Sequence, residues 1–401
     1  MHNVINVTDN IYWMGANDRR ISLFENHFPL QFGVSYNSYF IDDEETAVMD
    51  TADEAVLTRY FENLEYALHG RKLNYLIVQH MEPDHCAGIA AVAAKYPEAK
   101  IVVNAKTLTF LKQFFPEAKT WPDRFVVVGN GETLQVGKTS LTFVFAPMVH
   151  WPEVMVTYDS THKVLFSADA FGSFGALNGN IFNDHADMRA NISEYRRYYT
   201  NIVGKYGMQA ARLLKAASGL DFKIICPLHG LILRQDFAYI VDKYTKWATY
   251  TPEDKAVMIA FGSMYHHTEN AVEILGAELD RLGVKNISIY DVSNVDCAYL
   301  VAESFRCSHL VFAAPTYMND LYPQMAHLLH SLQAHGLKNR DVALIGNGSW
   351  APQSVKIMNG FMEKMNDMRL IGSVEFASAV DDHNVEELKQ LAANIAASLQ
   401  A

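Results

Sequence analysis

The last 150 or so residues of the chain repeat one unit, a short apolar strand followed by an amphipathic helix, and this repetition limits the possible folds more than any other feature. Strands are predicted at KAVMIAF, NISIY, HLVFAA, DVALIG and RLIGSVEFA, and helices at residues 268–282, 297–305, 322–335, 354–365 and 384–399. Because the connections between such strands nearly always have the same hand, consecutive units place their strands in parallel. The sequence therefore predicts a doubly wound, five-stranded parallel sheet with helices on both faces.

The preceding part of the chain has a different pattern, in which short strands predominate. Strands are expected over residues 33–41, 45–50, 74–79, 100–104, 124–129, 140–146, 153–159 and 163–167, with helices over residues 54–68, 88–95, 106–115 and 193–217. This pattern predicts two sheets packed face to face and covered by helices. The change of pattern falls at a polar segment that contains Pro252, and 401 residues are too many for a single core. We therefore expect two domains, residues 1–250 and 251–401.

The composition excludes several classes of protein. A net charge of −12 argues against nucleic acid or an anionic membrane surface as the partner. The N-terminus lacks the basic start and apolar core of a signal peptide, and no apolar run reaches the roughly 18 residues of a membrane helix. The four cysteines, Cys86, Cys226, Cys297 and Cys307, form no C-x-x-C pair, which is typical of reduced thiols in a cytoplasmic protein. A cytoplasmic location without membrane contact is the expectation.

One segment of the N-terminal half concentrates metal-binding side chains. His80-Met81-Glu82-Pro83-Asp84-His85 lies between a predicted buried strand and a predicted helix, so it is expected to form the connecting loop. Its acids have no Lys or Arg nearby, and their mutual repulsion is relieved most simply by a bound metal ion. The alternative is a polar surface loop whose side chains are merely solvated.

Further candidate ligands follow other predicted strands. They are His150 in APMVHWPE, Asp169 in SADAFG and His229 in PLHG. Loops at one edge of a sheet can bring distant parts of a chain together. Seven donors are too many for one ion but suit two ions that share a bridging carboxylate.

The order of these residues resembles that of the metallo-β-lactamase superfamily, and the resemblance to the flavodiiron proteins within it covers essentially the whole chain. Glu82 stands where most of that superfamily has a histidine, and a glutamate there is typical of the flavodiiron proteins. The resemblance implies a metallo-β-lactamase-like αββα sandwich with a diiron centre. It implies that His80, Glu82 and His150 bind one iron, that Asp84, His85 and His229 bind the other, and that Asp169 bridges them. Some members of the family leave the histidine at position 85 uncoordinated.

The identity of the metal depends on Glu82. Anionic oxygen donors stabilise ferric iron, as a cycle between ferrous and ferric states requires, whereas imidazoles suit a zinc-bound hydroxide that hydrolyses substrates. The alternative hypotheses are therefore a dizinc hydrolase of the β-lactamase type with a flavodoxin-like appendage, and an electron carrier whose metal domain is only structural.

Three loops of the C-terminal domain are candidates for cofactor binding, because they follow the carboxyl ends of predicted parallel strands. Hydroxyl groups and the N–H groups of a helix start can hold a phosphate there without Lys or Arg, and Tyr317 and Trp350 are expected to flank a flat ring. The loops resemble those of flavodoxins and flavodiiron proteins, although the family commonly has Gly-Asn in place of His266-His267. The resemblance implies FMN, held by Ser263, Met264, Tyr265, His266, His267, Thr268, Pro315, Thr316, Tyr317, Met318, Asn319, Asn347, Gly348, Ser349 and Trp350.

The resemblance also implies a function and partners. The expected activity is the reduction of dioxygen to water, of nitric oxide to nitrous oxide, or of both. No Cys-rich rubredoxin module follows in this sequence, so a separate donor such as rubredoxin or a flavin reductase is expected. A head-to-tail homodimer, or a dimer of dimers, is expected to place the FMN of one chain beside the irons of its partner.

Overall fold

The computed structural model describes residues 2–400, which form two compact units. One unit contains the residues up to Tyr199 together with Met208–Asp242, and the other contains Thr200–Gly207 and the residues from Lys243 onward. None of the helices within residues 2–400 combines the length and the apolar character needed to cross a membrane.

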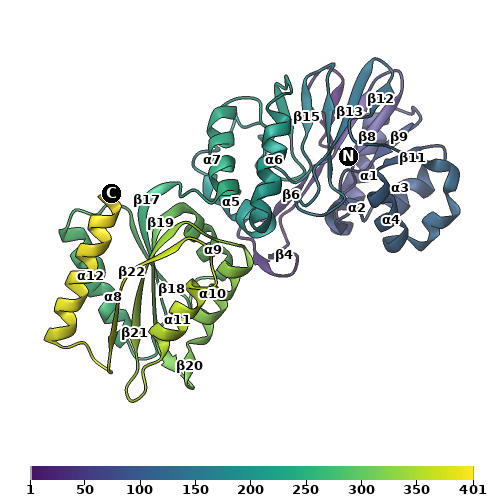
Figure 1. The fold of residues 1–401 in the computed structure, drawn as a ribbon. Coiled ribbons are helices and arrows are strands. Elements are labelled where there is room, and N and C mark those ends of the chain that lie inside the picture. Colours follow the sequence, from purple (N-terminus) through teal and green to yellow (C-terminus); the bar gives the residue numbers. More distant parts are fainter. Residues whose placement is uncertain (1, 401) are drawn as a thin grey trace. The chain divides into compact units, whose positions relative to one another are not determined.

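The first unit contains two large sheets. Among the described residues, one sheet has seven strands in the order β1-β2-β7-β8-β9-β10-β11, and the other has five in the order β12-β13-β14-β15-β16. In Figure 1 the helices α1, α3 and α4 lie on one side of this pair of sheets, and α6 lies on the other. The prediction of two packed sheets covered by helices is confirmed. The strands of the first sheet are β1 (Ile5–Asn6), β2 (Ile11–Trp13), β7 (Tyr39–Asp42), β8 (Thr46–Met49), β9 (Tyr75–Ile77), β10 (Lys100–Val103) and β11 (Phe125–Val127).

The second sheet and the helices of this part of the chain have the following bounds. The strands are β12 (Thr133–Val136), β13 (Thr139–Phe145), β14 (Met155–Asp159), β15 (Val164–Phe166) and β16 (Ile224–Cys226). The helices are α1 (Leu57–Leu68), α2 (Pro83–Cys86), α3 (Ile89–Lys95), α4 (Ala105–Phe114), α5 (Ile192–Tyr198), α6 (Gly207–Ala217) and α7 (Phe237–Thr249). Strands β8 to β11 run parallel, as do β15 and β16, so the loops that follow β9, β15 and β16 leave from carboxyl ends of parallel strands.

The stretch from Gly33 to Ile41 is not one strand, and that prediction is wrong. It forms β6 (Val34–Tyr36), which pairs with β3 (Ala16–Asp18) in a separate small sheet, and then β7 in the large sheet. The strand breaks because the Asn37 side chain donates to the carbonyl oxygens of Pro227 and Gly230, at 2.9 Å each. A second small sheet, the hairpin of β4 (Leu23–Phe24) and β5 (Phe28–Pro29), was not predicted.

The prediction of one helix over residues 193–217 is also wrong. The chain forms α5, a π-helical turn at Tyr199–Val203, a 3₁₀ turn at Gly204–Tyr206, and then α6. Glycine is among the poorest helix formers, and two glycines fall inside this stretch. A side chain at Gly207 would collide with the carbonyl oxygen of Ala248, so the irregular segment packs where only glycine fits.

The second unit is a doubly wound parallel sheet, as predicted. Its main strands lie in the order β18-β17-β19-β21-β22 and all pair in parallel, which is the flavodoxin-like order. The strands are β17 (Asp254–Phe261), β18 (Ile287–Asp291), β19 (Cys307–Tyr317), β20 (Asp320–Leu321), β21 (Arg340–Asn347) and β22 (Met368–Phe376). The helices are α8 (His267–Arg281), α9 (Cys297–Arg306), α10 (Pro323–Ala334), α11 (Ser354–Met362) and α12 (Asp382–Gln400).

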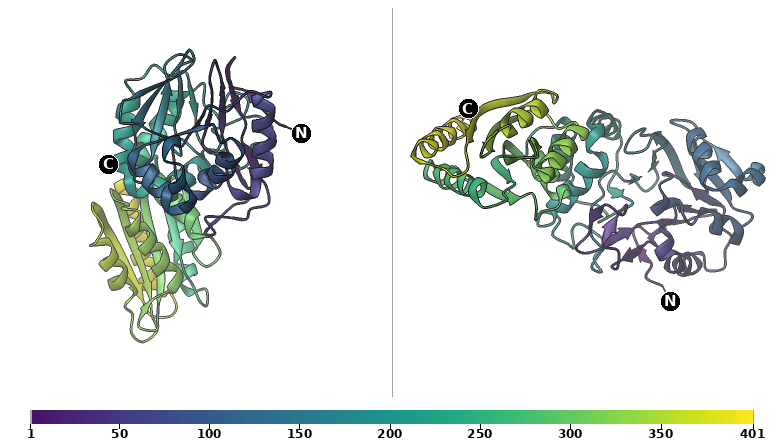
Figure 2. Two further views of the ribbon diagram at one scale, coloured as in Figure 1. Left: turned by 90° about the vertical axis from the view of Figure 1, so that its right-hand side faces the viewer. Right: turned by 90° about the horizontal axis from the view of Figure 1, so that it is seen from below.

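Alternate residues of the interior strand β17 divide the core of this sheet into two layers. Met258 packs with apolar residues of α9, α10 and α11, whereas Ile259 packs with residues of α8 and α12. These helices lie on opposite faces of the sheet in Figure 1, and Figure 2 shows the same layers from two further directions. The loops that follow β17, β19 and β21 therefore leave from one edge of a sheet that is buried on both faces.

Candidate functional site

The seven predicted metal ligands come from four separate segments of the first unit. His80 and Glu82 follow β9, whereas Asp84 and His85 lie on the short helix α2. The expectation that all six residues from His80 to His85 form a loop is therefore corrected, because Pro83 starts a helical turn. The remaining candidates lie in the loops after β13, β15 and β16, and they are His150, Asp169 and His229.

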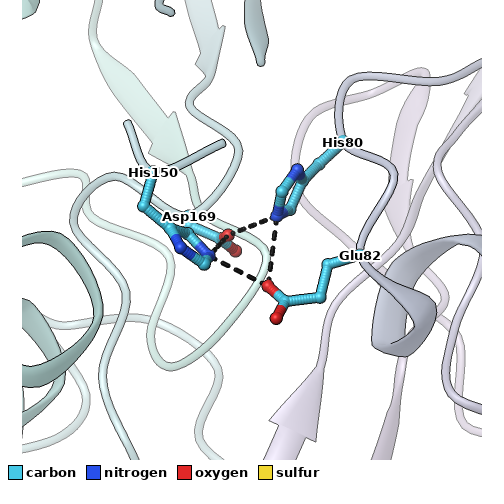
Figure 3. A group of neighbouring side chains, drawn as sticks. All are labelled: His80, Glu82, His150 and Asp169. Carbon is cyan, nitrogen blue, oxygen red and sulfur yellow. Dashed lines mark hydrogen bonds and ion pairs between the residues drawn. The ribbon is translucent and has the colours of Figure 1, made fainter. Parts of the chain in front are cut away.

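The structure brings these side chains into two groups of possible metal ligands, which are His80, Glu82, His150 and Asp169, and Asp84, His85 and His229. We refer to them as position A and position B. In position A, one oxygen of Glu82 lies 3.2 Å from His80 Nε2 and 2.9 Å from His150 Nε2. Asp169 Oδ2 lies 3.2 Å from His80 Nε2 and 3.3 Å from His150 Nε2, and Figure 3 shows all four side chains converging.

Position B is built in the same way. Asp84 Oδ2 lies 3.2 Å from both His85 Nε2 and His229 Nε2, and the two imidazole nitrogens are 3.0 Å apart. The second oxygen of Asp169, Oδ1, faces this group at 3.3 Å from His85 Nε2 and 3.7 Å from His229 Nε2. Asp169 thus presents one oxygen to each position, which is the arrangement of a bridging carboxylate.

These distances fit donors that share an ion. Two ligand atoms that are each about 2.1 Å from one ion lie roughly 3.0–3.4 Å apart, depending on the coordination angle. Both oxygens of Asp84 and both oxygens of Asp169 are buried without a hydrogen bond from any residue between 2 and 400. Buried carboxylates are normally hydrogen-bonded or bound to a metal. The donor set of imidazoles and carboxylates is one that iron accepts, so the residues present fit a pair of such ions.

The electrostatics of the cluster also favour a positive charge. Burial alone would lower the pKa of His80, but the charge of Asp169 outweighs it and raises that pKa well above its ordinary value. Burial is likewise outweighed at His150, where the nearby carboxylates of Asp169 and Glu82 raise the pKa to about 9. Burial would raise the pKa of Asp169, yet the positive charge of His80 holds it well below its usual range. The carboxylates therefore favour a positive charge at this place, which a metal ion supplies when the imidazoles are neutral.

Residues outside the seven hold the histidines, and sequence reasoning missed them. Glu153 Oε1 lies 2.9 Å from His80 Nδ1 and accepts a hydrogen bond of the same length from the N–H of Met81. His229 Nδ1 donates to the carbonyl oxygen of Ser35 at 2.7 Å. The contact of Glu153 with His80 joins residues 73 positions apart, so no local pattern indicates it. No local pattern distinguishes Ser35, because the contact joins residues 194 positions apart.

Glu25 was also not predicted. It lies in the turn between β4 and β5, where its backbone has a φ of 50°. Glu25 is exposed, yet partial desolvation of its carboxyl group and the negative charge of Glu82 raise its pKa to about 8. The neighbouring Phe24 packs edge-on against the ring of His229, with ring centroids 5.5 Å apart. The β4–β5 hairpin therefore contributes both an acid and an apolar wall to the metal cluster.

The second unit has a cavity of about 280 Å³ at the carboxyl ends of its strands. Of the predicted FMN residues, the structure brings together at this cavity Ser263, Met264, Tyr265, His267, Thr268, Pro315, Thr316, Met318, Asn319, Asn347, Gly348, Ser349 and Trp350. His266 and Tyr317 are not among the lining residues of the described chain. The His266 ring instead bonds Glu269 at 2.6 Å, and the Tyr317 ring packs edge-on against Tyr322. Ala351 and Ser378 line the cavity and were not predicted.

The walls of this cavity are fixed by contacts between the segments at the carboxyl ends of β19, β21 and β22. Asn347 and Ser378 exchange hydrogen bonds of 3.0 Å, which joins the loop after β21 to the loop after β22. The hydroxyl of Thr316 accepts the N–H groups of Gln353 and Ser354 at the start of α11. Among the described residues that line the cavity, none is acidic. A neutral, hydroxyl-rich pocket at the start of α8 fits a phosphate group, and the exposed Trp350 and Tyr265 offer apolar rings at its rim.

Comparison with known proteins gives consistent results for both units. A family model described as ODP family beta lactamase matches residues 34–230. Nitric oxide reductase of Moorella thermoacetica is 31% identical over 361 residues, which is 89% of this chain and 89% of that protein. The structure of rubredoxin oxygen:oxidoreductase from Desulfovibrio gigas is 26% identical, with a TM-score of 0.92 and 99% of each chain covered. The flavodiiron protein from Giardia intestinalis has the same fold, with a TM-score of 0.91 at 24% identity over 100% of this chain and 98% of that one. From its sequence, its two folds and the arrangement of its donor groups, this chain belongs to the flavodiiron protein family.

Proposed function

We propose that this protein is an oxidoreductase that reduces dioxygen to water, nitric oxide to nitrous oxide, or both. The observation that carries the proposal is the pair of donor groups that share Asp169, in which Glu82 supplies an anionic oxygen to position A. The similar proteins from Moorella thermoacetica and Desulfovibrio gigas are named as a nitric oxide reductase and an oxygen oxidoreductase. Their names support a reductase and give no support to the dizinc hydrolase.

In this proposal the first unit holds two iron ions. His80, Glu82 and His150 bind the ion at position A, Asp84, His85 and His229 bind the ion at position B, and Asp169 bridges the two. When bound, such a pair supplies electrons to a diatomic gas at open coordination positions. The protein itself orients the donors from four loops and shields position B with the rings of Phe24 and Tyr198, whose centroids lie 5.5 and 5.4 Å from that of His229. This wall excludes bulk water from one side of the cluster.

The cavity of the second unit holds FMN in this proposal. Backbone N–H groups at the start of α8 and the hydroxyls of Ser263 and Thr268 bind the phosphate, and Trp350 lies against the ring system. FMN bound there would supply electrons to the metal site. Reduction of dioxygen to water consumes four electrons and four protons, whereas coupling of two nitric oxide molecules consumes two of each. A two-electron flavin and two ferrous ions together store enough electrons for either reaction.

The partners and location complete the proposal. Rubredoxin is the proposed electron donor, because the Desulfovibrio gigas relative is named for it, and a flavin reductase is the alternative.

We place the metal domain in residues 1–250 and the flavin domain in residues 251–401. A domain of about 250 residues is on the order of 40 Å across. Electron transfer would therefore be fastest in a head-to-tail homodimer, alone or paired as a dimer of dimers, where each FMN faces the irons of the partner. The reduced cysteines fit a cytoplasmic location.

The test is an anaerobic assay on one sample whose iron, zinc and FMN contents have been measured. We expect about two irons and one FMN per chain, and consumption of dioxygen or nitric oxide when a reductant is supplied. His80→Asn should abolish gas reduction and leave the FMN content unchanged. Zinc in place of iron together with hydrolysis of a β-lactam or thioester would overturn the proposal, and so would full gas reduction by the His80→Asn variant. Full activity of a protein that sediments as a monomer would overturn the dimer.

A further inference from the structure

A buried carboxylate lies behind one of the two metal positions. Glu153 is 2% exposed, and its Oε1 contacts both the ring of His80 and the N–H of Met81. Its second oxygen, Oε2, is buried and has no hydrogen-bond partner among residues 2–400. A charged group in such surroundings is unfavourable unless it is offset by a positive charge nearby. A positive ion at position A supplies that offset, with the ionised carboxylate of Glu153 directly behind His80.

This contact determines how His80 faces the cluster. An ionised carboxylate can only accept hydrogen bonds, so His80 Nδ1 must carry the ring proton. The lone pair of Nε2 then points toward Glu82 and Asp169, which is the orientation a metal ligand needs. A carboxylate that accepts from the far nitrogen of a ligand histidine also makes the imidazole a stronger donor.

Position B lacks this arrangement. The ring of His229 donates from Nδ1 to a neutral group, the carbonyl oxygen of Ser35. His85 Nδ1 is buried and finds no hydrogen-bond acceptor in the described part of the chain. Asp169 contributes one oxygen to each position, so the shared carboxylate does not distinguish them. Of the ligand histidines His80, His85 and His229, only the first therefore has a carboxylate, that of Glu153, behind its ring.

We propose that Glu153 is a positioning residue that makes the two metal positions unequal, so that position A binds its ion more tightly and fills before position B. The inference rests on the two-metal site of the proposed function. Loss of a carboxylate behind a ligand histidine typically weakens metal binding about 10–100-fold. If Glu153 is replaced, this loss of metal affinity is expected at position A only.

The test is an anaerobic titration of the metal-free protein with ferrous iron against a chelator of known affinity. The wild-type protein should bind two ions in two separate steps. Glu153→Gln keeps an acceptor for His80 and removes the charge, so it should weaken the first step about 10-fold or more. Glu153→Ala removes both the hydrogen-bond acceptor and the charge, and it should weaken the first binding step further. Asp84→Asn, which removes the charge of a donor at position B alone, should weaken the second step and leave the first intact.

The chain provides a matched control for a general effect on stability. Asp159 is fully buried in the same domain and also bonds a histidine, with its Oδ2 lying 2.7 Å from His162 Nδ1, but it lies outside both positions. Asp159→Asn should lower the urea midpoint of the metal-free protein and leave both binding steps unchanged. The inference is overturned if Glu153→Gln leaves the first step within about twofold of wild type, if it weakens both steps equally, or if Asp84→Asn abolishes the first step. A wild-type protein that binds fewer than two ions would instead refute the proposed function.

Discussion

Asn37 lies between β6 and β7 and is hydrogen-bonded to the loop that carries His229. Replacing Asn37 by alanine should lower the stability of the fold and the affinity of position B for its ion. Its amide donates to Pro227 and Gly230 and accepts from the indole N–H of Trp13, each at 2.9 Å. All three bonds are buried. The substitution leaves the indole N–H of Trp13 and the carbonyl oxygen of Gly230 without these partners, whereas the carbonyl oxygen of Pro227 keeps its hydrogen bond from the Tyr39 hydroxyl. At about 1–1.5 kcal/mol for each lost bond, Asn37→Ala should lower the free energy of unfolding by about 3–5 kcal/mol.

The assay combines urea unfolding of the metal-free protein with an iron titration. Asn63 offers a matched control, because it is also fully buried and its amide donates to the carbonyl oxygens of Met14 and Gly15 at 3.0 Å each. Asn63→Ala should destabilise the protein comparably but bind two irons normally, whereas Asn37→Ala should lose affinity at position B. A loss below about 1 kcal/mol for Asn37→Ala, or normal binding of both irons, would refute the reasoning.

Three further predictions concern the second unit. A Cβ at Gly348 would lie 2.8 Å from the Pro352 backbone, so Gly348→Ala should displace the loop that follows β21. The variant should bind FMN at least tenfold more weakly in a fluorescence titration, and its iron content should be unchanged. The buried Arg340 guanidinium donates to five backbone carbonyl oxygens, and a lysine cannot reach them all. Arg340→Lys should therefore lower the free energy of unfolding in urea by about 2–4 kcal/mol. An unchanged free energy of unfolding would show that water replaces the lost hydrogen bonds. Burial lowers the pKa of His309 despite Asp341, and Arg369 and Lys255 lower it further. The unfolded chain therefore takes up a proton that the folded chain resists, and stability should fall as pH drops below about 6.5. Thermal unfolding of His309→Gln between pH 7.5 and 5.5 should show a smaller decrease than wild type, and an equal decrease would contradict this assignment.

The second unit could be predicted almost completely because each of its elements is specified locally. The predicted and observed bounds of α8 to α10 and α12 agree within about two residues, since apolar periodicity and the turns between elements lie within each segment. The FMN loops could be located for the same reason. Tyr317 is an exception, because the turn at Met318–Asn319 has positive φ at both residues and folds β20 back on β19. That turn pairs Tyr317 with Asp320, and its ring packs against Tyr322 and does not line the cavity.

The first unit was less predictable because long-range contacts override its local pattern. The seven donor residues could be recognised from residue type and position after strands. The supporting contacts could not, since those of Asn37 and Ser35 reach across more than 190 positions of the chain. A β-branched and aromatic stretch such as residues 33–41 favours one strand by composition alone. Only the carbonyl groups of the His229 loop explain why it is interrupted at Asn37.

The spread of the donors along the chain has a consequence for biosynthesis. Position A draws its side chains from His80 to Asp169, whereas position B needs His229, which leaves the ribosome 60 residues after Asp169. A nascent chain arrested between these residues could therefore capture one ion at most. Both metal positions can be filled only after the last strand of the second sheet has emerged and folded. A protein that holds two ions has therefore already assembled its entire N-terminal half.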